Sequence, residues 1–246
     1  MSLTSEPAPA ARRVAILQSN YIPWKGYFDI INQVDEFILY DDRQFTRRDW
    51  RNRNVIKTPQ GLHWLTIPVQ VKGRFEQRID ETMISDPEWS DRHWKTIAQA
   101  YRSAPHFGNL QAEFAALYAG STEERLSDVN RRFIEAVCGM LGIHTRLTWS
   151  SDYPAIGERT ERLVSLCLLS GAREYLSGPA ARAYIEEERF REAGITLRYM
   201  DYSGYPEYPQ LHGAFEHGVS IIDLLFNVGP DEAPRFMKSF GAGVSA

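Results

Sequence analysis

The stretch at residues 14–58 constrains the fold more than any other part of the chain. An apolar run at residues 14–17 leads into a polar turn, and a second apolar run follows at residues 37–40. Between the two runs, apolar residues at positions 28–34 recur at three- and four-residue spacing. This pattern predicts a short helix between two buried strands. Two strands joined by a short helical crossover are expected to pair in parallel.

Parallel pairs commonly bind ligands beyond the carboxyl ends of their strands. In this chain those ends are segments 18–24 and 41–49, and both are rich in polar and aromatic side chains. We therefore expect Gln18, Tyr21 and Trp24 to bind substrate.

The remainder of the chain alternates between strand and helix patterns. Strands are expected at residues 63–71, 78–83, 144–149, 174–177 and 195–199, and helices at residues 109–118, 126–141, 158–169, 181–193 and 219–226. The sequence therefore predicts an α/β fold, with a mostly parallel Rossmann-like sheet flanked by helices. A helical segment at about residues 87–141 is inserted or appended in the middle of the chain. We expect residues 13–240 to form a single domain and residues 1–12, rich in Ala and Pro, to form a disordered tail.

Composition limits the classes of function. With 246 residues, 43% of them hydrophobic, the chain can bury a core without disulfides or metal. The net charge of -4 disfavours a general nucleic-acid surface. Cys138 and Cys167 lie far apart in helical contexts, so we expect unpaired thiols in a cytoplasmic protein. No membrane span, phosphate-binding loop, dinucleotide glycine pattern, zinc spacing or calcium loop is found, so no nucleic-acid partner or metal is expected.

A charged run at residues 41–57 follows the second buried strand. Asp41 and Asp42 are candidate catalytic carboxylates, whereas Arg51, Asn52 and Arg53 are expected to hold phosphate or oxyanion charge. A solvated loop with local ion pairs is the alternative interpretation.

His93 is the strongest histidine candidate for a general base. It shares one face of a predicted helix with Trp89, Ile97 and Tyr101 at four-residue spacing. A histidine in this setting is either a packed core residue or a neutral base near the helix start. The pattern leaves both roles open.

Two later segments add candidate binding residues. Ser177 and Gly178 end a predicted strand and form a small-residue turn whose N–H groups suit an anion, although an ordinary turn is the alternative. Tyr208 and Gln210 belong to a loop rich in Tyr and Pro, which suits stacking on a sugar or base ring. All these strand-end residues are expected to line one cleft.

Several separated motifs together resemble the WbqC-like protein family, and the resemblance covers nearly the full chain. They are Gln18-Ser-Asn-Tyr-Ile-Pro-Trp-Lys-Gly-Tyr27, Asp41-Asp42, Arg51-Asn52-Arg53, Leu65-Thr-Ile-Pro68, His93 with Tyr101, Tyr175-Leu-Ser-Gly178, Tyr208-Pro-Gln210 and Asp223-Leu-Leu-Phe-Asn227. Ser19 stands where the family usually has Pro, and Tyr205 stands where a His is common.

The resemblance implies a role in surface-polysaccharide or tailoring biosynthesis. It favours a transferase that forms an amide on an amino sugar or similar amine. The expected donor is ATP-activated or a carrier-bound thioester, so ATP and an acyl carrier protein are candidate partners beside a small-molecule substrate such as a nucleotide sugar. Two alternatives stay open: a non-catalytic nucleotide-sugar binding protein, and a hydrolase that acts on the same ligand.

Overall fold

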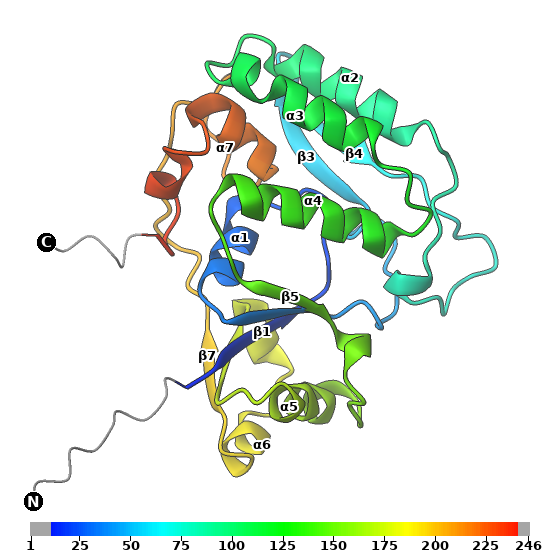
Figure 1. The fold of residues 1–246 in the computed structure, drawn as a ribbon, viewed down its shortest axis with the longest axis vertical. Coiled ribbons are helices and arrows are strands. Elements are labelled where there is room, and N and C mark those ends of the chain that lie inside the picture. The colour runs from blue at the N-terminus through cyan, green and yellow to red at the C-terminus, as the bar shows by residue number, and fades with distance from the viewer. Residues whose placement is uncertain (1–10, 241–246) are drawn as a thin grey trace, which may run out of the picture.

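A five-stranded parallel sheet organises the protein. The computed structural model describes residues 11–240, and the sheet has the strand order β5-β2-β1-β6-β7 (Figure 1). The predicted α/β class and parallel Rossmann-like sheet are thus confirmed. The strands are β1 (Arg13–Leu17), β2 (Glu36–Leu39), β5 (Arg146–Trp149), β6 (Glu174–Ser177) and β7 (Thr196–Tyr199).

Helices cover both faces of this sheet and extend beyond it. Figure 1 shows α1 and α4 on one side of the sheet, and α5 and α6 on the other. The helices are α1 (Lys25–Asn32), α2 (Trp89–Tyr101), α3 (Phe107–Ala119), α4 (Leu126–Met140), α5 (Arg159–Leu169), α6 (Glu187–Glu192) and α7 (Ile221–Val228).

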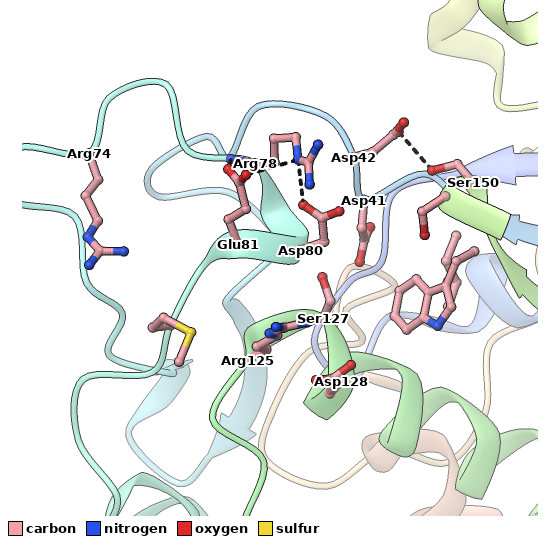
Figure 2. A pocket seen from close by; sticks show the side chains of 14 residues that line it. Asp41, Asp42, Arg74, Arg78, Asp80, Glu81, Arg125, Ser127, Asp128 and Ser150 are labelled. Carbon is pink, nitrogen blue, oxygen red and sulfur yellow. Dashed lines mark hydrogen bonds and ion pairs between the residues drawn. The ribbon is translucent and has the colours of Figure 1, made fainter. Parts of the chain in front are cut away.

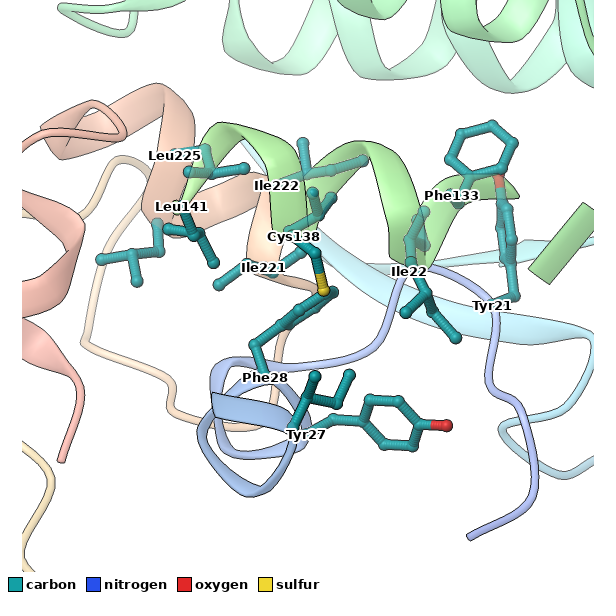
Figure 3. Close-up of a cluster of buried hydrophobic side chains, with 14 of the residues drawn as sticks. Tyr21, Ile22, Tyr27, Phe28, Phe133, Cys138, Leu141, Ile221, Ile222 and Leu225 are labelled. Atoms are coloured by element: carbon teal, nitrogen blue, oxygen red, sulfur yellow. The ribbon is translucent and has the colours of Figure 1, made fainter. Parts of the chain in front are cut away.

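The alternation of side chains along β1 produces two hydrophobic cores. Ala15 packs with the residues of α1, α4 and α7, whereas Val14 and Ile16 pack with α5 and α6 on the opposite face. Figure 3 shows the first core, where Phe28 of α1 lies among residues of α4 and α7, including Cys138. Because both faces are buried, β1 and β2 read as continuous apolar runs in the sequence.

The connection from β2 to β5 carries a separate subassembly. It begins with the antiparallel hairpin of β3 (Arg53–Thr58) and β4 (Gly61–Thr66), followed by α2, α3 and α4. The helical segment expected at about residues 87–141 therefore corresponds to three helices between two neighbouring strands of the sheet. In Figure 1 the hairpin and α2 and α3 lie on the far side of α4 from the sheet.

Some sequence-based boundaries are wrong. Residues 78–83 do not form a strand, because Glu81 accepts the Arg78 backbone N–H at 2.9 Å and closes a 3₁₀ turn at Ile79–Glu81. The helix expected at residues 181–193 is split into the 3₁₀ segment Pro179–Ala183 and α6. Further 3₁₀ turns lie at Ser150–Asp152 and Ala233–Phe236.

The N-terminal prediction is only partly accessible to the structure. Of the tail expected at residues 1–12, residues 1–10 lie outside the described residues. Arg12 is held in place, since its guanidinium donates to buried Glu36 at 2.6 Å.

The loop between β1 and α1 has a strained backbone. Ile22 is fully buried with a φ of 37°, which is costly for a β-branched residue. Its carbonyl accepts hydrogen bonds from Asn54 Nδ2 at 2.9 Å and Ser220 Oγ at 2.8 Å. Asn54 also donates to the Tyr21 carbonyl at 3.0 Å. The hairpin and the start of α7 therefore fix the course of the chain where it leaves β1.

A buried carboxylate joins α7 to the helical subassembly. Asp223 is fully buried and accepts hydrogen bonds at 2.7 Å from the Tyr101 hydroxyl, the Tyr208 hydroxyl and Gln210 Nε2. Burial raises the pKa of Asp223, and the three donors partly oppose that shift. Lys57 extends this network by donating to Gln210 Oε1 at 2.8 Å.

Replacing this carboxylate tests how much the network stabilises the fold. We expect Asp223→Ala to lower the free energy of unfolding by about 3 kcal/mol, because it leaves several buried donors without an acceptor. The matched control is Asp231→Ala at an exposed position, which should change stability by less than about 0.5 kcal/mol. Urea denaturation of both variants measures the difference. Equal stability of the two variants would show that the network contributes little.

Candidate functional site

A charged cavity of about 520 Å³ opens at the carboxyl ends of β2 and β5. Its position agrees with the general location of ligand sites in open parallel sheets. Figure 2 shows Asp42 and Ser150 at one side of it and Arg74 at the opposite side. The lining residues are Leu39, Asp41, Asp42, Arg74, Arg78, Asp80, Glu81, Met83, Arg125, Ser127, Asp128, Trp149, Ser150 and Ser151.

Asp41 is the most deeply buried carboxylate of this charged cavity. It is 1% exposed and accepts two hydrogen bonds from Ser19, from the backbone N–H at 2.7 Å and from the hydroxyl at 2.6 Å. Burial raises its pKa, and the Ser19 hydrogen bonds act in the opposite direction. Both oxygens are thus used to tie the end of β2 to the end of β1, which suits a positioning role.

Asp42 has the opposite electrostatic environment. Burial acts to raise its pKa, but hydrogen bonds from Arg43 and Ser150 and the charge of Arg162 outweigh burial and leave the pKa below its ordinary value. Ser150 donates at 2.8 Å, and Arg162 forms an ion pair with the other carboxylate oxygen. Asp42 is therefore a stable anion near neutral pH.

Asp80 faces the same cavity and was not among the residues singled out from the sequence. Its backbone N–H donates to the Asp41 carbonyl at 3.0 Å, which places the two residues side by side. Burial raises the pKa of Asp80, although Arg78, at 2.9 Å, partly opposes the shift. The neighbouring acids Asp80 and Asp42 are thus pushed in opposite directions, a pattern typical of acid–base pairs in active sites.

Ser127 adds a buried hydroxyl to the same cavity. It lies at the start of α4 and is 2% exposed. Figure 2 shows it between Asp80 and Asp128. Its hydroxyl hydrogen bonds to Asp41 and opposes the rise that burial causes in the pKa of that carboxyl group, so Ser127 supports Asp41 at the cavity wall.

His93 lies in an aromatic core. Its Nδ1 is 2.9 Å from the Tyr21 hydroxyl, and its Nε2 is 3.1 Å from the Thr66 carbonyl. The carbonyl requires a proton on Nε2, so Nδ1 accepts from Tyr21. Burial lowers the pKa of His93 to about 4. His93 and the predicted binding residue Tyr21 are therefore both engaged within the core, an arrangement that favours a structural role for each.

A second cavity, of about 290 Å³, lies at the end of β1 and is called the aromatic pocket here. Its walls include Trp24 and the exposed Trp50. Arg51 lies beside it and donates to Gln18 Oε1 and Asn20 Oδ1. The lining residues are Asn20, Pro23, Trp24, Trp50, Asn54, His217 and Gly218.

The remaining predicted binding residues line neither of these two cavities. Ser177 is buried at the end of β6, which pairs in parallel with β1, so it lies on the same edge of the sheet as Gln18, and Gly178 precedes the 3₁₀ segment Pro179–Ala183. Tyr208 and Gln210 contribute to the buried Asp223 network.

Two predicted binding residues belong instead to the hairpin. Asn52 donates to the Ile67 carbonyl at 2.9 Å, and the Arg53 guanidinium stacks over Trp64, 4.1 Å from the ring centroid. Asn52 and Arg53 also line a third cavity, of about 350 Å³. The candidate residues are therefore distributed over the charged cavity, the aromatic pocket, this third cavity and the buried Asp223 network rather than one cleft.

Comparison with known proteins identifies the family. The family model described as WbqC-like protein family matches residues 18–234. The chain belongs to the WbqC-like protein family. It is also 53% identical over 227 residues to the uncharacterized protein Rv1507c of Mycobacterium tuberculosis (strain ATCC 25618 / H37Rv), covering 92% of this chain and 98% of that protein. No solved structure matches.

Two further features of this WbqC-like protein follow from the described residues. Within residues 11–240, no helix combines the length and apolar character needed to cross a bilayer. The same residues contain no group of three or more His, Cys, Asp or Glu side chains placed to hold a metal ion.

Both cysteines are free and buried, as the sequence predicted. Burial raises the pKa of each thiol to about 12. Their dispensability for chemistry remains a prediction.

The state of His93 can be tested through the pH dependence of stability. The unfolded chain protonates this side chain near pH 6.5, whereas the folded protein protonates it only near pH 4. Stability should therefore fall as the pH drops through this window, with about 3 kcal/mol of the loss due to His93.

A His93→Gln variant should be less stable at pH 7 and should show a correspondingly smaller loss between pH 7 and pH 4. The control is His144→Gln at an exposed position, which should retain the wild-type pH dependence. Urea denaturation at several pH values provides the measurement. If His93→Gln lost as much stability between pH 7 and pH 4 as the wild-type protein, the pH dependence would belong to other groups.

Proposed function

We propose that the protein is a transferase that forms an amide on an amino sugar or similar amine. The observation that carries this proposal is the composition of the charged cavity. Its acids Asp80 and Asp42 have pKa values shifted in opposite directions, and the same cavity is lined by arginines. An amine substrate needs an anion to bind its ammonium form and a base to remove its proton. Acyl transfer also needs positive charge or N–H donors for the developing oxyanion. The cavity contains side chains for each requirement.

The residues divide these tasks according to their environments. Asp42, which stays ionised, binds the ammonium group, and Asp80, with its raised pKa, removes the proton. The amine nitrogen then forms a bond to the acyl carbon of the donor while the bond from that carbon to the thioester sulfur or phosphate oxygen breaks, and the second proton of the nitrogen passes to the departing sulfur or oxygen. Arg125 or Arg74 stabilises the oxyanion, and the released thiol or phosphate leaves. The base role passes from His93 to Asp80, because both nitrogens of His93 are engaged in the core.

Family membership supports the biological setting of this proposal. We propose that the reaction belongs to surface-polysaccharide or tailoring biosynthesis in the cytoplasm, with a nucleotide sugar as the candidate acceptor. The donor is an ATP-activated acyl or aminoacyl group, or a thioester on an acyl carrier protein.

A non-catalytic nucleotide-sugar binding protein is the second candidate. The hydrogen bonds of Asp41 and the ion pair of Asp42 favour a binding protein. Ser19 donates to both carboxylate oxygens of Asp41, and Arg162 pairs with Asp42. A hydrolase acting on the same ligand would use the same carboxylates. Its reaction products would distinguish it from a transferase.

The test is to incubate the protein with amino-sugar nucleotides and with acyl or aminoacyl donors, and to search for a new amide by mass spectrometry. We expect Asp80→Asn to lower the rate by about 100-fold or more, since it removes the base. Wild-type activity should increase with pH through the pKa of Asp80, because the base acts when deprotonated. The matched control is Asp91→Asn on the exposed face of α2, which should retain full activity.

Three outcomes would count against the transferase. Ligand binding without an amide product under any donor would favour the binding protein. Ligand cleavage without an acceptor would favour the hydrolase. Full activity of Asp80→Asn would remove this residue from the mechanism.

A further inference from the structure

The aromatic pocket is lined in part by the loop that follows β1, the central strand at which the strand order of the sheet reverses. Beyond β1, the chain proceeds to β2 and β5 on one side, whereas β6 and β7 lie on the other. Open α/β sheets bind ligands in the crevice at this point. The pocket is distinct from the charged cavity, since the two share no lining residue.

A glycine in the first turn of α1 leaves space for the side chain that forms one wall of the pocket. A Cβ atom at Gly26 would lie only 2.3 Å from the Trp24 indole, so this side chain can lie across the helix start only because residue 26 has no side chain. Tyr202 and Tyr205 hold the other side of the indole by edge contacts, with ring centroids at 5.1 and 5.6 Å. The position of Trp24 is thus fixed in advance of any ligand.

The opposing wall is an exposed aromatic side chain on an anchored backbone. Trp50 is 43% exposed, and its ring centroid lies 5.3 Å from that of Trp64. Its carbonyl accepts the Tyr21 N–H at 3.1 Å, which ties it to the strained loop after β1. An exposed tryptophan with a fixed backbone is suited to stacking on a planar ring.

Arg51 supplies positive charge next to this pocket. Its guanidinium hydrogen bonds go to the neutral amide oxygens of Gln18 and Asn20, and Asn20 also lines the pocket. The carboxylate of Asp49 forms an ion pair with Arg51 at 3.7 Å, and the charge of Arg51 also acts to lower the pKa of buried Asp41. Neither carboxylate accepts a hydrogen bond from the guanidinium, whose fork suits a phosphate group.

We propose that the aromatic pocket and Arg51 together bind a nucleoside phosphate, with the base between Trp24 and Trp50 and a phosphate on Arg51. A volume of about 290 Å³ suits the base rather than a complete nucleotide. The side chains of Asn20 and His217 at the pocket provide polar groups for the ring edge, which an acyl chain would not use. The ligand extends the proposed function, as either an activating nucleotide or the nucleotide part of a sugar substrate.

The test measures binding alone by calorimetry, with adenosine, AMP, ATP, UDP and ribose 5-phosphate as probes. We expect the nucleotides to bind about tenfold or more tightly than adenosine or ribose 5-phosphate, because only they engage both parts of the site. Tighter binding of ATP than of UDP would support an activating nucleotide, and the reverse would support a nucleotide sugar. No binding of any nucleotide at millimolar concentration would overturn the proposal.

Variants assign the two halves of the site. Trp50→Ala should weaken the binding of AMP and of UDP by about tenfold. Arg51→Gln should abolish the preference for AMP over adenosine, whereas Arg102→Gln, on an exposed arginine, should not. Unchanged nucleotide binding in Trp50→Ala and Arg51→Gln would refute the assignment.

Two glycine variants test whether the position of the Trp24 side chain matters for binding. Gly26→Ala should weaken nucleotide binding by displacing the indole, while Gly108→Ala, with open space around it in α3, should bind normally. Circular dichroism checks that each variant is folded. If Gly26→Ala does not fold, Trp50→Ala still tests the site independently. Equal binding by the two folded glycine variants would show that Trp24 is not part of the site. Asp80→Asn should bind nucleotides normally, so a failure of amide formation is distinguishable from a failure of this site.

Discussion

A buried chain of hydrogen bonds at the carboxyl ends of β1 and β2 positions both cavities. Asp41 accepts from the Ser19 hydroxyl at 2.6 Å, and that hydroxyl accepts from Asn130 Nδ2 at 2.9 Å. Asn130 Nδ2 also lies 2.9 Å from the Arg51 carbonyl. These contacts join two strand ends, α4 and the segment before the hairpin. Buried polar groups are costly unless they are paired, so this network specifies one arrangement of the four elements.

The network also requires a particular kind of residue at position 19. Asp41 accepts hydrogen bonds from both the backbone N–H and the hydroxyl of Ser19, and a proline there could supply neither. In this chain the end of β2 is therefore tied to the end of β1 by two short hydrogen bonds. Asp80 is fixed in turn by its backbone hydrogen bond to the Asp41 carbonyl. The geometry of the charged cavity thus depends on a side chain outside it.

Local patterns were sufficient to predict much of the fold. The apolar runs of β1 and β2 and the periodicity of α4 come from neighbouring residues, so a parallel pair and its flanking helices could be read from the sequence. The site was harder, because its parts meet only through long-range folding. Asp80 appeared to lie in a strand, and only the turn closed by Glu81 directs it toward Asp41. Gln18 follows directly on β1, but the sequence did not indicate that Trp24 lines a pocket together with Trp50 and His217, or that Arg51 hydrogen bonds to Asn20 of that pocket.

The helical spacing of His93 identified its buried face but not its role. A core histidine and a catalytic one share the same periodicity, and only the partners of the two ring nitrogens distinguish them. Here one nitrogen faces Tyr21 and the other a backbone carbonyl, and burial lowers the pKa, so the ring stays neutral. The same desolvation raises the pKa of the carboxyl group of Asp80, where it produces a stronger base.

The charged cavity and the aromatic pocket differ in chemical character, and our two proposals assign a different part of the ligand to each. Carboxylates dominate the end of β2, whereas Arg51 and two tryptophans dominate the end of β1. A ligand carrying an amine at one end and an aromatic base with phosphate at the other would match this separation of charge. The strained backbone at Ile22 lies on the segment that lines the aromatic pocket through Asn20 and Pro23, and Asn54 and Ser220 hold its carbonyl from the hairpin and from the start of α7. The helical subassembly and the C-terminal segment therefore act on function by holding this segment in a single conformation.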